Sequence, residues 1–334
     1  MNLSLLIVFI TLLCILRNVV ESQSSSKTTK LTTTKLPPYP TRPNFVNYYV
    51  SSKLGDELIR LIESELSKLS KKICLKFKKQ SSKATKIGIN FYYGRNNNVK
   101  LSDSENKPTT VIRNYTQYDT KTIANTSFDF YSKMLPSPYF RSNNGQKTYA
   151  FLPDLPQYYE KNINRTEFFS YNDIKRLWYL YCRDKCGKKN DCKNSAYFKN
   201  DCNHCQCPKP FAGDKCQHIL KNDKSCGRTQ IYFISSEREI HEKENIQSFC
   251  SYVVKGENGK KVKFEILNLK LSREDACDKG FGVEVKYRKD KGARGLFLCD
   301  NHTDISIPAL SNEIYFTFSD TGKNMLEFRI QEVK

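Results

Sequence analysis

Apolar side chains recur every three or four positions between Gly55 and Cys74, and this spacing predicts an amphipathic helix. Glu and Lys occupy most of the positions between them, so one face is apolar and should pack against a sheet. The chain then becomes extended at Cys74–Phe77. The apolar positions of the helix are Leu58, Ile59, Ile62, Leu66, Leu69 and Ile73.

Two further patterns complete the first folded region. Apolar residues alternate from Ile87 through Ile89 and Phe91 to Tyr93, which predicts a half-buried strand. Ser170 and Asp173 are spaced as a capping box that opens a short helix. The apolar face of that helix is expected to hold Ile174, Leu177, Trp178 and Tyr181. Helices and strands in this order predict an α+β domain over residues 45–182.

From Cys226 onward the pattern changes to short alternating segments separated by Gly, Asn and Asp. Such segments at near-regular spacing predict an all-β sandwich over residues 226–334. The alternating sets are Val262, Phe264 and Ile266; Val283, Val285 and Tyr287; Ile314, Phe316 and Phe318; and Leu326, Phe328 and Ile330.

The N-terminal residues predict secretion. Residues 1–22 have the features of a signal peptide, with an uncharged apolar run at Leu3–Leu16. Residues 23–44 are rich in Ser, Thr, Lys and Pro, which predicts a disordered stalk. No later stretch approaches the length of a membrane span. The N-glycosylation sequons are at Asn114, Asn125, Asn164 and Asn301.

The formal net charge of +20 would favour binding to sulfated glycans or other acidic surfaces. The lysines are spread along the whole chain, however, and this distribution also fits an ordinary solvated surface. We expect no nucleic-acid partner for a secreted chain.

Cysteine is the other informative residue type. The chain has thirteen cysteines, and removal of Cys14 with the signal peptide leaves an even number, which predicts a disulfide-bonded protein. Seven of them lie between Cys182 and Cys216. A zinc knuckle is an alternative use of that cluster, but an oxidising compartment favours disulfides. Six cysteines of the cluster could pair with one another in fifteen ways. These six are Cys186, Cys192, Cys202, Cys205, Cys207 and Cys216.

The last four cysteines of the cluster read C-x2-C-x-C-x8-C, with Phe211 and Gly213 inside the final loop. This pattern resembles the C-terminal half of an epidermal-growth-factor-like (EGF-like) module and places one at residues 183–217. The resemblance implies the pairs Cys186–Cys202, Cys192–Cys205 and Cys207–Cys216.

Three segments resemble the astacin metallopeptidases, most of all the nematode members that join an astacin domain to an EGF-like and a CUB domain. KKICLKFKK with IGINFYYG resembles the first helix and strand, YDTKTIANTSFDFYS the Met-turn segment, and FFSYNDIKRLWYLYC the C-terminal helix. FTFSDTGKNMLEF resembles the closing hairpin of a CUB domain. The resemblance implies a truncated metzincin domain at 45–182, a CUB sandwich at 226–334, and disulfides Cys74–Cys182, Cys226–Cys250 and Cys277–Cys299.

This chain lacks the zinc-binding and catalytic residues of the astacins. Astacins bind zinc through H-E-x-x-H-x-x-G-x-x-H, which supplies three imidazoles and a Glu base. This chain has four histidines, all after Cys182, and only two dozen residues separate Gly94 from Tyr118 where the family has its catalytic helix. The S-x-M-H-Y Met-turn falls on Thr122–Thr126, so Ala124, Asn125 and Thr126 replace Met, His and Tyr. The histidines are His204, His218, His241 and His302.

No catalytic residue or metal ligand is therefore predicted. Asp103, Glu105 and Asp119 offer oxygen ligands, but carboxylates scattered in a polar loop are usually only solvated. Some CUB domains hold calcium, and the Asp of their usual C-x-x-D falls on Gly280 here, although Asp320 is present. We therefore expect no cofactor.

The sequence thus predicts a secreted astacin relative without its catalytic machinery, which binds an extracellular protein or glycan through its CUB domain. One alternative is an active zinc endopeptidase whose catalytic segment is missing through splicing or a gene-model error. Another is a polyanion-binding protein that works by charge alone.

Overall fold

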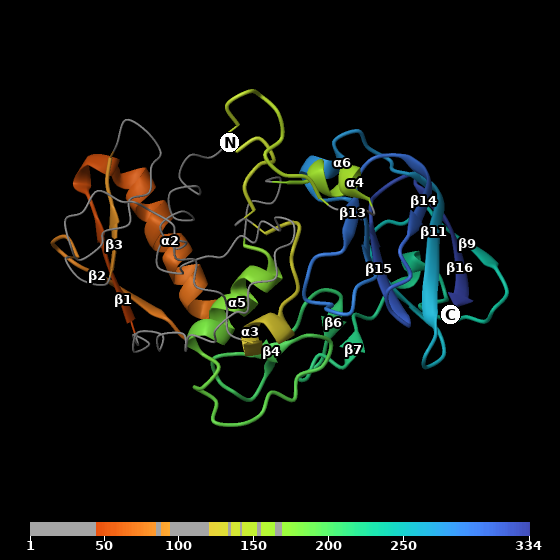
Figure 1. Cartoon of the computed structure of the whole chain (residues 1–334), viewed down its shortest axis with the longest axis horizontal. Helices are drawn as coiled ribbons and strands as arrows, with labels where there is room; N and C mark the ends of the chain where they lie inside the picture. The colour runs from red at the N-terminus through yellow and green to blue at the C-terminus, as the bar shows by residue number, and fades with distance from the viewer. Residues whose placement is uncertain are drawn as a thin grey trace, which may run out of the picture. The chain divides into compact units, whose positions relative to one another are not determined.

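The computed structural model describes residues 45–84, 88–93, 120–132, 135–140, 142–151, 155–163 and 169–334 (Figure 1). The chain forms two compact units. The first comprises Met1–Ala124 with Arg176–Gly187, and the second Asn125–Lys175 with Lys188–Lys334. Residues 125–175, expected to belong to a domain ending at Cys182, therefore group with the C-terminal region. The expected domain boundaries otherwise stay predictions, and residues 1–44 lie outside the described residues.

The first unit contains a three-stranded parallel sheet in the order β2-β1-β3. Helix α2 follows the central strand and lies along this sheet (Figure 1). The elements are β1 (Phe45–Val50), the 3-10 helix η1 (Ser52–Leu54), α2 (Asp56–Lys72), β2 (Lys76–Lys79) and β3 (Gly88–Phe91).

The periodic pattern predicts α2 correctly, since Ile62, Leu66 and Leu69 are buried on one face. The predicted strand from Ile87 to Tyr93 forms only as β3, and the side chain of Tyr93 is 71% exposed. Strand β1 was not predicted, although Val46, Tyr48 and Val50 alternate and are buried. A disulfide joins Cys74 to Cys182, the pair that the resemblance implies.

Short helices and hairpins precede the sandwich. Helix α5 begins with the predicted capping box: the amide of Ser170 donates to the Asp173 carboxylate at 3.0 Å, and the amide of Asp173 donates to Ser170 Oγ at 3.1 Å. These elements are α3 (Thr120–Asn125), α4 (Pro156–Glu160), α5 (Tyr171–Tyr181), β4 (Tyr197–Phe198), β5 (Cys205–Gln206), β6 (Phe211–Ala212), β7 (His218–Ile219) and η2 (Lys224–Cys226).

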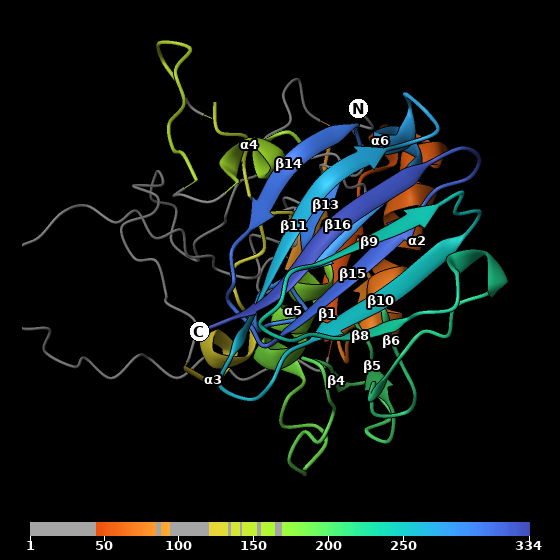
Figure 2. The same cartoon turned by 90° about the vertical axis from the view of Figure 1, so that its right-hand side faces the viewer.

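The C-terminal region is a sandwich of two sheets (Figure 2). One sheet has the order β13 (Leu296–Leu298), β12 (Gly282–Lys286), β15 (Glu313–Ser319), β10 (Phe249–Lys255) and β8 (Ile231–Phe233). The other has the order β14 (His302–Ile307), β11 (Lys261–Lys270), β16 (Met325–Val333) and β9 (Glu239–Glu244). Helix α6 (Ala276–Lys279) precedes β12.

The four predicted alternating sets form β11, β12, β15 and β16, and their inward side chains are almost fully buried. The expected closing hairpin is wrong, because β15 and β16 belong to different sheets. Both strands present apolar rows, so the rows face each other across the sandwich, with the Phe316 and Phe328 ring centroids 5.1 Å apart.

The remaining observed disulfides join Cys192 to Cys205, Cys207 to Cys216, Cys226 to Cys250 and Cys277 to Cys299. These are the pairs that the EGF-like and CUB resemblances imply. Cys186 and Cys202 are also disulfide-bonded, and their expected pairing with each other stays a prediction. Among the described residues, no helix is long and apolar enough to cross a membrane.

Candidate functional site

The counterpart of the Met-turn lies at the end of α3. Ala124 and Asn125 are exposed, whereas Thr126 is buried. These three side chains are a methyl group, an amide and a hydroxyl, so none of them supplies an imidazole or a phenol to a metal. The other oxygen-ligand candidates of the sequence, Asp103, Glu105 and Asp119, lie outside the described residues.

The histidines do not form a metal site elsewhere. His204 contacts Asp201 at 2.8 Å, His241 contacts Glu239 at 3.1 Å, and the His302 ring packs edge-on against Tyr158. Within the described part of the chain, two groups of side chains are close enough to share a metal: Asp191, Cys192 and Cys205; and Cys277, Cys299 and Asp300. Their sulfurs are joined in disulfides and cannot act as thiolate ligands. The residues present therefore do not fit a catalytic zinc ion.

Asp320 has its oxygen atoms occupied by neighbours in the sandwich. The side chain is fully buried and accepts hydrogen bonds from the Ser272 amide at 2.9 Å, the Ser272 hydroxyl at 2.7 Å and the Thr321 amide at 2.8 Å. Gly280, at the other expected calcium position, has φ of 74° and no side chain to offer. The residues therefore do not fit calcium, because a hydroxyl and two amides already compensate the carboxylate.

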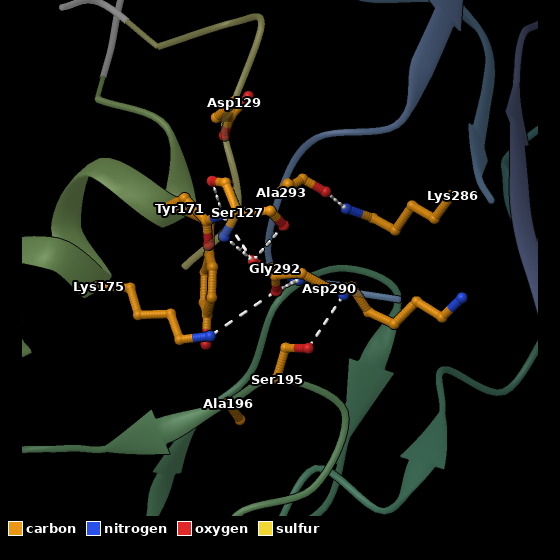
Figure 3. Close-up of polar contacts among 12 residues, drawn as sticks. Ser127, Asp129, Tyr171, Lys175, Ser195, Ala196, Lys286, Asp290, Gly292 and Ala293 are labelled. Carbon is orange, nitrogen blue, oxygen red and sulfur yellow. Dashed lines mark hydrogen bonds and ion pairs between the residues drawn. The ribbon is translucent and has the colours of Figure 1, made fainter. Parts of the chain in front are cut away.

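A densely connected polar group of the second unit surrounds Asp290 (Figure 3). We call Ser127, Asn172, Lys175, Asp290 and Gly292 the Asp290 cluster. One carboxylate oxygen accepts from the Ser127 amide at 2.8 Å, the Ser127 hydroxyl at 2.9 Å and the Asn172 amide at 2.9 Å. The other accepts from the Gly292 amide at 2.9 Å and lies 3.7 Å from Lys175 Nζ. Segments far apart in the sequence thus converge on one carboxylate.

Electrostatics decides the protonation state of this carboxyl. Burial alone raises its pKa, but the positive charge of Lys175 and the hydrogen bonds from Ser127, Asn172 and Gly292 outweigh burial and lower the pKa of Asp290 to about 2. The Lys175 side chain is only 2% exposed. A buried ammonium needs such a partner, because an unpaired charge is costly in the interior.

The Asp290 cluster resembles a serine–base arrangement only superficially. A general base works best when its pKa lies near the operating pH. The pKa of Asp290, about 2, lies far below neutral pH, so its carboxylate is too weak a base to take a proton from the Ser127 hydroxyl. In addition, the oxygen that accepts from the Ser127 hydroxyl accepts two further hydrogen bonds. The geometry holds Ser127 in place but does not activate it as a nucleophile, so the cluster's role is structural.

Asp290 belongs to the loop between β12 and β13, residues 287–295, which joins several parts of the second unit. Arg288 donates to the Phe128 carbonyl at 2.7 Å. The Lys291 amide donates at 3.0 Å to Ser195 Oγ of residues 183–217, which we call the cysteine-rich module. Lys291 Nζ donates to the Glu313 carbonyl of β15 at 2.8 Å, and burial lowers the pKa of Lys291 to about 8. The side chains of Arg288 and Lys291 therefore form hydrogen bonds within the protein.

Other segments of the chain cover part of the outer face of the five-stranded sheet. Ser251 and Tyr315 are buried there, although their strand neighbours already fill the sandwich core. The Phe211 ring packs 4.7 Å from the Tyr315 ring, and Ser251 Oγ donates to the Leu220 carbonyl at 2.7 Å. At the β13 edge, the Tyr131 hydroxyl accepts from the Phe297 amide at 3.0 Å. Residues 125–175, the cysteine-rich module and Leu220 thus bury much of this face, whereas Ile231 and Phe233 at the β8 edge are exposed.

Two of the four sequons lie among the described residues, and both asparagines are exposed. The side-chain oxygen Oδ1 of Asn301 accepts from the Leu271 amide at 2.8 Å. Asn114 and Asn164 lie outside the described residues. The exposure of Asn125 and Asn301 is compatible with attached glycans, whose presence stays a prediction.

The sequence does match known proteins, but only in part. No family model matches the chain. Zinc metalloproteinase nas-34 of Caenorhabditis elegans is 33% identical over 139 residues, which are 41% of this chain and 22% of the relative. Zinc metalloproteinase nas-36 of the same nematode is 27% identical over 188 residues, 52% of this chain and 29% of the relative. The homologues of this chain are nematode astacin-family zinc metalloproteinases. The chain spans less than a third of the length of these two astacin-family relatives.

Solved structures with local similarity are CUB-containing proteins. The CUB2 domain of MASP-1 bound to Ca2+ shares 14% identity at a TM-score of 0.25, over 30% of this chain and 96% of that domain. The CUB1-EGF-CUB2 region of human MASP-1/3 shares 16% identity at a TM-score of 0.25, over 45% of this chain and 57% of that chain.

Replacement of Asp290 by Asn should destabilise the second unit, because it leaves the buried Lys175 ammonium without its carboxylate. We expect the free energy of unfolding at pH 7 to fall by about 3 kcal/mol, measured by urea denaturation with the disulfides intact. The depressed pKa of Asp290 stabilises the native protein above pH 4, and this contribution is lost between about pH 4 and pH 2. The variant should therefore be less sensitive to acid in that window.

The control is Asp275→Asn, which removes an exposed carboxylate paired with Arg273. It should leave the unfolding midpoint at pH 7 nearly unchanged. Equal destabilisation by both substitutions would contradict the structural role of the Asp290 cluster.

Removal of divalent cations should not alter the stability of the sandwich. Because protein donors already compensate Asp320, we expect the same thermal midpoint in millimolar calcium and in excess chelator. The measurement is scanning calorimetry of the full chain, with Ser272→Ala as a positive control that lowers the midpoint in both solutions. A midpoint that rises with calcium would show that a cation binds the native state.

Proposed function

We propose that this chain is an extracellular binding protein that descends from the astacin metalloproteinases but does not hydrolyse peptides. The single observation that carries the proposal is the absence of histidine from residues 1–203. Astacin chemistry requires three imidazoles around one zinc ion, because the metal must bind and acidify the attacking water. The homologues are named zinc metalloproteinases, and this chain lacks the groups that would hold their metal.

The residues that align with the astacin Met-turn also support the absence of a catalytic metal. Ala124 and Thr126 stand where the family has the Met beneath the metal and the Tyr beside it. The adjoining Ser127 is hydrogen-bonded to Asp290, which connects the former Met-turn segment to the sandwich loop. This segment has therefore acquired a packing role that does not require a metal.

The binding role rests on the module order. A signal-like N-terminus and the disulfides favour an extracellular location. An EGF-like module followed by a CUB-type sandwich is an arrangement used for recognition of proteins or glycans. Binding is thus the function that the retained modules can perform when the catalytic residues are absent.

A second candidate is an active peptidase whose catalytic segment is missing from this sequence. The short interval between Gly94 and Tyr118, flanked by family-like segments, favours it. A missing exon would not, however, also change the separate positions Ala124 and Thr126. Sequencing of the transcript across codons 94–118 distinguishes the two, since only a longer product encoding H-E-x-x-H would restore the enzyme.

The direct test combines metal analysis with an activity assay on the glycosylated full chain, purified from a secreting cell line. After equilibration with micromolar zinc and gel filtration, mass spectrometry of the metal should show substoichiometric zinc. No chelator-sensitive cleavage of gelatin or of a fluorogenic peptide library should occur. An active astacin peptidase purified in parallel validates both assays. Stoichiometric zinc together with chelator-sensitive hydrolysis would refute the proposal.

A further inference from the structure

Among the described residues, the face of the three-stranded sheet opposite to α2, here called the open face, carries exposed lysine side chains. In β1, Val46, Tyr48 and Val50 are buried on the helix side, so Phe45, Asn47 and Tyr49 point to the other side. The register pairs Phe45 with Lys76 and Asn47 with Lys78 of the edge strand β2. Lys76 and Lys78 therefore project from the open face, and both are exposed.

Positive charge is concentrated in the stretch of sequence that forms this part of the sheet. The stretch from Lys68 to Lys83 holds seven lysines and no acidic residue. Two of them are paired on the helix side, Lys68 with Glu65 at 2.7 Å and Lys79 with Glu63 at 2.6 Å. Among the described residues, the other five form no ion pair: Lys71, Lys72, Lys76, Lys78 and Lys83.

An aromatic ring lies beside these lysines. Tyr92, directly after β3, is 44% exposed, and Lys83 Nζ lies 5.0 Å from the centre of its ring. The Tyr49 ring packs 6.0 Å from the Tyr92 ring and supports it. Lys83 is thus brought over the open face next to an accessible ring.

The loop that carries Lys83 is fixed by hydrogen bonds. Asn90 accepts from the Ala84 amide at 2.8 Å and donates to the Ala84 carbonyl at 2.9 Å. Gln80 donates to Asn47 at 3.0 Å. Because these polar groups satisfy one another, they hold the loop against β1 and β3. Among the described residues, Lys76, Lys78 and Lys83 form no ion pair on this face.

We propose that Lys76, Lys78, Lys83 and Tyr92, which we call the lysine face, bind a sulfated glycan chain. Lys76 and Lys78 project to the same side of an edge strand about 7 Å apart, so they present a row of charge to repeated sulfate groups. An exposed tyrosine ring can pack against the apolar face of a sugar. The inference deepens the proposed function, since it names the ligand class and the surface of an extracellular binding protein.

The experiment uses the full glycosylated chain and heparin oligosaccharides of defined length. The variant Lys76→Ser/Lys78→Ser/Lys83→Ser removes three positive charges from the lysine face. The control Lys188→Ser/Lys189→Ser/Lys193→Ser removes the same charge from exposed positions of the cysteine-rich module. Circular dichroism and thermal midpoints establish that both variants fold.

Binding is measured by isothermal titration calorimetry at several salt concentrations. The lysine-face variant should bind about tenfold more weakly at physiological salt, with a shallower salt dependence, because fewer ions are released on binding. The control should retain native affinity. Tyr92→Ala should weaken heparin binding and leave its salt dependence unchanged. Tyr92→Phe keeps the aromatic ring and should bind with native affinity.

Equal losses in the lysine-face variant and the control would overturn the assignment of this surface and indicate binding by net charge alone. Equal affinity for heparin and for chemically desulfated heparin, or no binding by the native chain, would overturn the ligand class. These results would leave the non-catalytic function intact, since that function fails only if zinc-dependent hydrolysis is found.

Discussion

One largely buried carboxylate links several segments of the second unit. Asp290 accepts hydrogen bonds from Ser127, from the start of α5 and from its own loop, and it pairs with the buried Lys175. A charged group removed from water must find such partners, and removal of one would leave another unsatisfied. Residues 125–175 and the β12–β13 loop therefore hold each other in place.

The same contacts fix the segment that resembles an astacin Met-turn. Ser127, directly after that segment, is hydrogen-bonded to Asp290 of the sandwich. The cysteine-rich module covers another part of the same five-stranded sheet through Phe211. Much of the outer face of that sheet is thus internal, although Ile231 and Phe233 at its β8 edge are 46% and 76% exposed. The lysine face of the first unit is a separate exposed surface.

Local patterns predicted the elements whose burial is regular. Ile62, Leu66 and Leu69 identified α2, and the alternating rows of β11, β12, β15 and β16 identified the sandwich. Apolar alternation does not specify the partner of a strand, so β15 and β16 were taken for a hairpin although they lie in opposite sheets. Strand β1 was missed because polar Asn47 and two tyrosines weaken its pattern.

The disulfide pairs followed from resemblance, but the Asp290 cluster could not be predicted. Ser127 lies 163 residues and Asn172 118 residues from Asp290, and no short motif links them. Nor does any local pattern indicate that Arg288 and Lys291, in a run of basic residues, make internal hydrogen bonds. The lysines of 68–83 were visible in the sequence, but only the register of β2 shows which of them share a face.

Hydrogen–deuterium exchange of the full chain, followed by mass spectrometry, tests most directly whether residues 125–132 and 287–295 form one body. The account predicts that the amides of Ser127 and Gly292 exchange as slowly as those of β12, because the same buried carboxylate accepts both. If peptides covering 125–132 exchange as fast as the exposed Glu257–Lys260 turn while β12 stays protected, the interlock does not exist in solution and the account is wrong.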